Sequence, residues 1–398
     1  MKRISILLAA LALSAFTATA QQAVNDVKFG KGLLNYVAQD SSFSVKFAPR
    51  MQYRYYGDYD MGGENIDHTF VLRRSRFKFG GWVVNPNIVY KMEFGLSNND
   101  LSGGNDYTKG APRMILDAVI KYKFAPGWEF WAGQTKLPGN VERVVSSANL
   151  QLVDRSRLNS RFNIDRDLGV HLRHKSKLPM GMVTKEKFAI SQGEGRNITG
   201  GNVGGLQYTA RLEFLPFGEF AKKGDYTHAA LVREETPKLM LAYTYNFNAD
   251  AVKTRGNMGD YMYLADGSFY HTDITTHFVD AVMKYKGISF QGEWTTRSAA
   301  AAVAVEADGT ATGDVVLTGG GYSAQLGYML TDHYEVVGRY TSLAFGQETG
   351  KDPFTQYTAG FNNYIVGHKL KVQSDISYII DEKGNEGVAF RLGFDLHF

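Results

Sequence analysis

The sequence predicts an all-β protein, a transmembrane antiparallel β-barrel of about 16 strands with a constriction loop folded inward. Three observations carry this prediction. Short segments along most of the chain alternate apolar and polar side chains, which is the period of a strand. After residue 20, the sequence contains no apolar run long enough for a spanning helix. One long basic segment, residues 137–167, interrupts the strand pattern and is the expected constriction loop.

The first twenty residues are typical of a secretory signal peptide. Lys2 and Arg3 supply a positive start, residues 4–16 form an apolar run, and Ala18 and Ala20 give the small-residue cleavage pattern. We therefore divide the chain into a signal peptide at 1–20, a periplasmic segment without strand alternation at 21–40, and a barrel at 41–398.

Composition excludes several classes of protein. The chain has no cysteine, which rules out disulfides, zinc–thiolate sites and thiol nucleophiles. Its formal charge is only +4, and Lys2 and Arg3 contribute half of that, so the basic footprint of a nucleic-acid-binding protein is missing. Abundant Gly, Tyr and Phe with only nine Pro leave two possibilities, a soluble periplasmic β protein or a membrane barrel.

The C-terminal segment 388–398 gives the clearest strand pattern. Large apolar side chains occupy every second position from Val388 to Phe398, with small or polar residues between them. Its length matches a tilted strand crossing a bilayer, about 9–11 residues. Segment 369–380 repeats the pattern. A soluble sandwich could do the same, but the number of such segments and their aromatic ends favour a barrel with aromatic girdles.

Seventeen segments have strand character: 43–56, 68–83, 87–96, 112–124, 128–136, 168–176, 186–192, 205–215, 228–233, 238–248, 275–286, 288–297, 313–330, 334–344, 356–366, 369–380 and 388–398. Segment 228–233 is the weakest, and bacterial barrels prefer even numbers, so we predict sixteen strands. A barrel of this size has an aqueous lumen. Segments 249–274 and 298–312 are interpreted as outer loops.

The strand at 68–83 is the most basic. Alternation places Arg74, Arg76 and Lys78 on one face and Phe77 on the other. Arg73 falls on the Phe77 side, near a strand end where a long side chain can snorkel. A cation facing lipid costs about 2–4 kcal/mol near the bilayer midplane. The first three cations should therefore face the lumen.

The same reasoning places other cations inside the barrel, namely Arg50, Arg54, Lys121, Lys123, Arg173, Lys175 and Arg211. The loop 137–167 adds further arginines, among them Arg143, Arg155 and Arg166. One interpretation is that these cations pair with lumenal acids, the candidates being Glu93, Asp117, Glu213 and Glu293. The other is that they outnumber the acids along part of the lumen, as in pores that select anions or phosphate.

Catalytic and metal sites have little support. His171 and His174 are three residues apart in a predicted strand, so they point to opposite faces and cannot share a metal ion. Neither a nucleophile elbow nor a phosphate-binding loop motif is present. Asp58 and Asp60 precede two glycines and fit a polar turn better than a calcium loop. We expect no enzyme activity and no cofactor.

Ordered blocks of sequence run along the chain: Leu72-Arg-Arg-Ser-Arg-Phe77, Tyr90-Lys-Met-Glu-Phe94, Asp117-Ala-Val-Ile-Lys-Tyr122, Gly133-Gln-Thr-Lys-Leu-Pro138, Glu142-Arg143, Asp154-Arg-Ser156, Asp165-Arg-Asp-Leu-Gly-Val170 and Arg233-Glu-Glu-Thr-Pro-Lys-Leu239. Together these blocks resemble the phosphate-selective porin O/P family, in a form typical of the Bacteroidetes. The resemblance extends from about residue 40 to the C-terminus. It departs at Gly139, where the family commonly has an aromatic residue, so the constriction should have a different shape.

The resemblance implies an outer-membrane porin of a Gram-negative bacterium, in contact with membrane lipid and forming a homotrimer. It implies passive diffusion of small anions, such as phosphate or polyphosphate, along lumenal Arg and Lys side chains. A general non-selective porin, a barrel enzyme and a surface binding scaffold are the alternatives. Alternation and resemblance together give nine candidate anion-binding or pore-lining residues: Arg74, Arg76, Lys121, Lys136, Arg143, Arg155, Arg166, Arg173 and Arg211.

Overall fold

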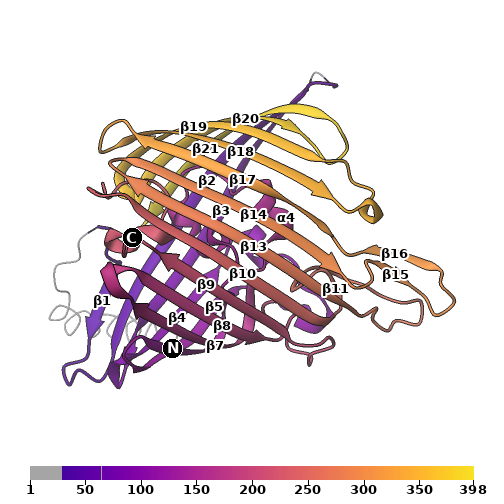
Figure 1. Ribbon diagram of the computed structural model, residues 1–398, viewed down its shortest axis with the longest axis horizontal. Helices are drawn as coiled ribbons and strands as arrows, with labels where there is room; N and C mark the ends of the chain where they lie inside the picture. Colours follow the sequence, from indigo (N-terminus) through magenta and orange to yellow (C-terminus); the bar gives the residue numbers. More distant parts are fainter. Residues whose placement is uncertain (1–28, 64) are drawn as a thin grey trace, which may run out of the picture.

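The structure, a computed structural model, describes residues 29–63 and 65–398. Its main sheet is a closed antiparallel barrel of sixteen strands (Figure 1). The last strand, β21 (Glu386–His397), pairs with the first barrel strand, β2 (Ser44–Asp60), and this pairing closes the barrel. A short added strand, β1 (Leu34–Val37), also pairs with β2.

The other barrel strands are β3 (Asn65–Val83), β4 (Asn85–Gly95), β5 (Ile115–Ala125), β6 (Trp128–Lys136), β7 (Arg166–Lys177), β8 (Val183–Ser191), β9 (Gln207–Leu215), β10 (Lys238–Ala251), β13 (Thr272–Tyr285), β14 (Ile288–Ala299), β17 (Gly319–Met329), β18 (Tyr334–Phe345), β19 (Phe354–His368) and β20 (Leu370–Ile380). Two hairpins lie outside the barrel sheet, β11 (Lys253–Arg255) with β12 (Met258–Tyr261) and β15 (Val303–Val305) with β16 (Ala311–Val315).

Helical elements are short: α2 (Asn98–Leu101), α3 (Val141–Val144), α4 (Arg157–Phe162), η2 (Asp106–Thr108), η3 (Ser147–Asn149), η4 (Pro179–Gly181), η5 (Ala221–Tyr226) and η6 (Gln347–Thr349). Within the part of the chain that the structure describes, no helix is long and apolar enough to cross a membrane.

The predicted number of strands is confirmed, with three corrections. Residues 228–233 form no strand. Segment 313–330 is not continuous, because the chain leaves hairpin strand β16 after Val315 and enters the barrel only at Gly319, whose φ is 107°. Strand β1 lies inside the segment 21–40, where we expected no strand. The predicted signal peptide lies outside the described residues.

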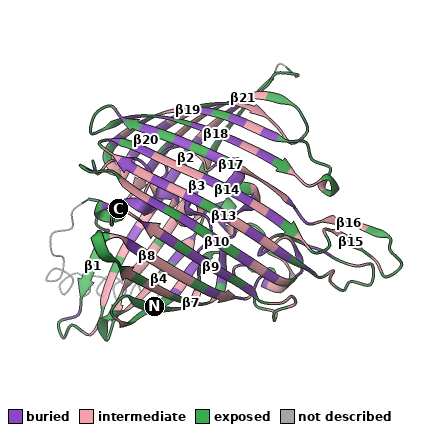
Figure 2. Ribbon diagram, in the orientation of Figure 1, coloured by how far each residue is buried: buried purple, intermediate pink, exposed green. Residues whose placement is uncertain are grey.

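Burial alternates along the strands, as Figure 2 shows by the stripes of buried and exposed residues around the barrel. In β9, each odd-numbered residue from Gln207 to Leu215 is buried, and most even-numbered ones are exposed. Outward-facing residues are large and apolar, for example Leu212, Ile376 and Phe394, each about half exposed. Such a surface suits a lipid-facing band, with the polar residues turned to the inside.

The two ends of the barrel differ in the length of their connections. The end that carries hairpin β15–β16 has long loops, and the opposite end, where the chain terminates at Phe398, has short turns (Figure 1). In bacterial barrels the long loops are extracellular and the short turns periplasmic. One connection breaks this rule. Residues 216–237, between β9 and β10, form a long segment at the short-turn end, which we call the lower insert.

Candidate functional site: the basic lumenal cavities

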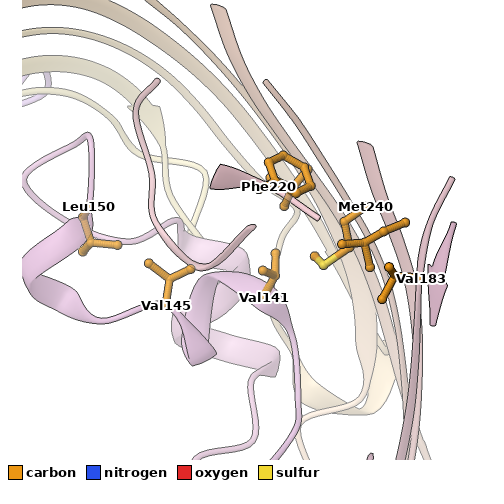
Figure 3. Packing of buried hydrophobic residues seen from close by; sticks show 8 residues of the cluster. Val141, Val145, Leu150, Val183, Phe220 and Met240 are labelled. Atoms are coloured by element: carbon orange, nitrogen blue, oxygen red, sulfur yellow. The ribbon is translucent and has the colours of Figure 1, made fainter. Parts of the chain in front are cut away.

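The connection between β6 and β7 folds into the barrel, which confirms the predicted inward loop. This constriction loop runs from residue 137 to 165, and Arg166 already begins β7. Its buried Val141, Val145 and Leu150 belong to one apolar cluster with Val183 and Met240 of the barrel wall (Figure 3). Apolar burial therefore fixes part of the loop against the inner side of the wall.

Buried cations of the wall also hold the loop. Arg211 of β9 donates to the Gly139 carbonyl at 2.9 Å, and Arg297 of β14 donates to the carbonyl of Phe162 at 2.8 Å. From β18 and β20, two further cations donate to loop carbonyls: Arg339 to Asp154 at 2.9 Å and Lys371 to Leu150 at 2.6 Å. These bonds give buried N–H groups of the cations an acceptor.

The lower insert occupies a neighbouring part of the lumen. Its Ala229 and Ala230 are buried in a cluster with Met329 and Tyr364 of the wall. The backbone N–H of His228 donates to the Asn149 carbonyl of the constriction loop at 3.0 Å. Loop and insert therefore meet inside the barrel and fill the side of the lumen that faces β13–β20. The apolar residues that suggested a strand at 228–233 are instead packed inside.

A cavity of about 320 Å³ lies between the constriction loop and the opposite wall, β3–β7. We call it the upper cavity. Twelve Lys or Arg and only four Asp or Glu line it, an excess of eight formal positive charges. The cations are Arg73, Arg74, Arg76, Lys78, Lys91, Lys121, Lys136, Arg143, Arg155, Arg166, Arg173 and Arg196. The acids are Glu93, Asp100, Asp117 and Asp165.

The four acids are shared among some of these cations. Asp117 accepts from Lys91 at 2.7 Å and from Arg166 at 3.1 Å. Asp100 accepts from Arg76 at 2.7 Å, and Asp165 forms a close pair with Arg143. Burial alone would raise the pKa of Asp165, but Arg143 and Arg166 hold it far below its usual range. Arg76 likewise lowers the pKa of Asp100 against the opposing effect of burial.

The remaining cations are not neutralised. Among the described residues, seven cations of the upper cavity form no ion pair with a carboxylate: Arg73, Arg74, Lys121, Lys136, Arg155, Arg173 and Arg196. Backbone carbonyls satisfy some of them, since Lys136 donates to the Arg143 carbonyl at 2.7 Å and Arg155 to that of Glu142 at 2.8 Å. A carbonyl accepts a hydrogen bond without cancelling the charge of its donor, so the positive charge remains available to a solute.

Arg73 corrects an expectation from strict alternation. The pairing of β2 with β3 shifts register, because Gln52 opposes Arg74 while Tyr53 opposes Leu72. Arg73 is therefore the extra residue of a β-bulge, a feature that re-aims a side chain. Arg73 lines the upper cavity beside Arg74. It does not snorkel on the Phe77 side.

A larger cavity, of about 970 Å³, lies toward the short-turn end. We call it the lower cavity. It is lined by β4–β8 and by residues of the lower insert, including Asp225 and Tyr226. Seven Lys or Arg and three Asp or Glu line it. Both cavities are lined by Lys121, Trp131 and Arg173, so they meet at these three side chains, which we call the junction.

Eight of the nine candidate residues line the upper cavity, and Arg211 does not. Arg211 is buried against Glu213, at 2.8 Å, and Asp280, where it anchors the constriction loop. Sequence reasoning missed Arg196, which lies in the long loop after β8, because alternation gives no information on loops. It also missed Trp131, because only charged residues were considered. No cluster of potential metal ligands occurs within residues 29–63 and 65–398.

Comparisons with known proteins agree with this architecture. Residues 45–386 match the family of phosphate-selective porins O and P. An uncharacterized protein of Aquifex aeolicus (strain VF5) is 26% identical over 377 residues, covering 86% of this chain and 83% of that protein.

Two solved structures show the same fold at low sequence identity. The anion-selective porin from Comamonas acidovorans superposes with a TM-score of 0.54 at 10% identity, covering 89% of this chain and 100% of that one. The trimer form of OmpT, an outer membrane protein of Vibrio cholerae, has a TM-score of 0.51 at 12% identity, covering 90% of this chain and 100% of that one.

Proposed function

Because the chain belongs to the phosphate-selective porin O and P family, we propose that this outer-membrane porin conducts small anions in preference to cations, with phosphate among its solutes. The observation that carries the proposal is the excess of positive charge in the upper cavity, where twelve cations face four acids. The family and the fold are those of a channel, and we assign the chain no catalytic role.

The excess of positive charge in the upper cavity should attract anions. A cleft lined by one sign of charge with low-dielectric walls concentrates counter-ions. Because the constriction loop and lower insert fill the other side of the lumen, a solute must pass beside the basic wall. Lys136 and Arg155 donate to backbone carbonyls, and Arg74 donates to the Gln52 amide oxygen. These neutral partners leave the cations able to receive an anion.

Phosphate fits this set of side chains. The planar guanidinium group can form two parallel hydrogen bonds to phosphate oxygens, and such charge-assisted bonds are stronger than neutral ones. We assign this role to the eight candidate residues that line the upper cavity, namely Arg74, Arg76, Lys121, Lys136, Arg143, Arg155, Arg166 and Arg173. Arg211 is assigned a structural role.

We also propose that the protein assembles as a homotrimer after removal of residues 1–20. The trimer form of the Vibrio cholerae OmpT supports this by similarity of fold. Crosslinking of the purified protein in detergent, or its mass by light scattering, measures the assembly state. A monomer would exclude the trimer without affecting the channel proposal.

Reconstitution into a planar bilayer tests the selectivity. Under a gradient of KCl, we expect a reversal potential of the sign that chloride permeation produces, and we expect phosphate to reduce the chloride current. A reversal potential near zero would instead identify a general non-selective porin. A potential of the opposite sign would exclude anion preference altogether.

A further inference from the structure

The junction between the two cavities is built on three neighbouring strands. Lys121 of β5 places its Nζ 3.7 Å from the centroid of the Trp131 ring of β6. Arg173 of β7 places its guanidinium carbon 3.5 Å from the same ring. Both cations thus have one indole as their common partner. Neither forms an ion pair with a carboxylate of the described residues.

A carboxylate neighbours one of them in the sheet. Glu129 lies directly opposite Arg173 in the register of β6 with β7 and opposite Lys123 in that of β5 with β6. Instead, Glu129 accepts a hydrogen bond from the indole Nε1 of Trp131 at 2.9 Å. Trp131 therefore contacts both cations with its ring and holds the carboxylate of Glu129 with its N–H group.

These contacts position charges without cancelling them. A cation is attracted to the quadrupole of an aromatic ring, which carries no net charge, so the cation remains free to attract an anion. A direct salt bridge between Arg173 and Glu129 would orient the guanidinium equally well. It would also occupy the hydrogen-bond donors that an oxyanion needs.

We propose that Trp131 is a specificity-determining positioning residue, which keeps Lys121 and Arg173 as an uncompensated pair that receives a small oxyanion between the upper and lower cavities. This inference rests on the proposed anion-preferring channel. It goes beyond that proposal by assigning selectivity to a neutral aromatic residue and by placing an oxyanion site at the junction.

The test uses the full-length protein in planar bilayers and inorganic phosphate as the probe. The quantity measured is the phosphate concentration that halves the chloride current. In Trp131→Leu, Glu129 loses its indole donor and pairs with Arg173. We expect the half-blocking concentration to rise about tenfold, corresponding to one lost charge-assisted hydrogen bond. Trp294→Leu is the matched control, because Trp294 is exposed on β14 and lies far from the junction in sequence and in the sheet.

A double variant separates positioning from simple loss of packing. In Trp131→Leu/Glu129→Gln the competing carboxylate is gone, so block by phosphate should return toward the wild-type concentration. A merely structural role for Trp131 predicts that the double variant stays as weak as the single one, and that result overturns the inference. Block of Trp131→Leu at the wild-type concentration also overturns it.

Controls on the wild type separate this inference from the proposed function. Wild-type channels that prefer anions but are not blocked by phosphate refute the junction site and leave anion preference standing. Wild-type channels that prefer cations refute the proposed function. The single-channel conductance in KCl alone, together with the β-sheet circular dichroism spectrum, reports whether each variant still forms the barrel.

Discussion

The two sides of the barrel wall use the same residue types for different purposes. On β3–β7, arginines and lysines line the upper cavity, and seven cavity-lining cations lack a carboxylate partner among the described residues. From β9 to β20, Arg211, Arg297 and Lys371 are almost fully buried and donate to carbonyls of the constriction loop. Arg74, Lys121 and Arg173 of the first set, and all three cations of the second, face inward by strand alternation. The segment that packs against a cation decides whether the cation lines the cavity or donates to a backbone carbonyl.

This difference explains how the pore is shaped. A buried cation is tolerated only when its N–H groups are satisfied, so each anchoring cation fixes a particular carbonyl of the loop. The anchored loop, with the lower insert, fills that side of the lumen. The open part of the lumen therefore lies on the opposite side, beside β3–β7, where the remaining cations are found. Loop anchoring and the proposed anion selectivity are therefore two consequences of one distribution of Arg and Lys.

The largest effect should come from breaking an anchor. Arg211→Leu leaves Asp280 buried without its cation and leaves Glu213 paired with Lys187 alone, and removing one partner of a buried ion pair costs about 3–5 kcal/mol. We expect a lower melting temperature of the purified barrel and a noisier single-channel current, because the loop near Gly139 loses its tether. Arg233→Leu is the control, since its pair with Asp332 is exposed and worth at most about 1 kcal/mol. Equal melting of both variants would contradict the anchoring role.

Shortening the lower insert should affect conductance more than selectivity. Replacing residues 219–235 with a short Gly-containing turn removes the buried His228, Ala229 and Ala230 from the lumen. We expect a single-channel conductance about twofold higher, because a wider lumen carries more water and ions. The reversal potential should keep its sign, because the cations of the upper cavity remain. An unchanged conductance would show that the insert does not limit the pore.

A matched pair of arginines compares the two sides directly. Arg73 lines the upper cavity, whereas Arg297 is buried and bonded to the carbonyls of Phe162 and Asn163. One charge acting across about 10 Å of water contributes about 0.4 kcal/mol to a permeating ion. Because the charge attracts an anion and repels a cation by this amount, Arg73→Gln should reduce the anion-to-cation permeability ratio about fourfold, with no change in melting temperature. Arg297→Gln should lower the melting temperature instead. A lower melting temperature for Arg73→Gln, together with a reduced permeability ratio for Arg297→Gln, would contradict this comparison.

The sequence predicted the wall better than it predicted the interior. Alternation located sixteen strands and oriented Arg74, Arg76 and Arg173 inward, because a strand's two faces follow directly from its period of two. It could not separate Arg173, which lines both cavities, from Arg211, which is buried beneath the loop. That distinction depends on contacts between residues far apart in the chain.

The alternation of apolar and polar residues also could not predict local irregularities of the chain. The bulge at Arg73 depends on how two strands pair, so a single strand read alone placed this residue on the wrong face. The weak strand signal at 228–233 came from apolar residues that pack inside the lumen as part of an insert. Trp131 carries no charge, and its part in the junction follows only from the neighbouring positions of Lys121 and Arg173.

The smallest expected effect concerns pH. The loop acids Asp100 and Asp165 have pKa values held below the usual range by Arg76 and Arg143. A depressed pKa keeps a carboxylate ionised as the pH falls, so the charge of these two groups should not change between pH 7 and pH 4. We expect their contribution to the reversal potential to be flat over this range, whereas aspartates of ordinary pKa, about 3.9, would begin to protonate and strengthen the anion preference. In Arg143→Gln, Asp165 loses its closer cation and keeps Arg166 at 3.8 Å, so burial raises the pKa of Asp165 above its wild-type value, and anion preference should then increase on acidification. Its absence would mean that Arg143 does not control Asp165.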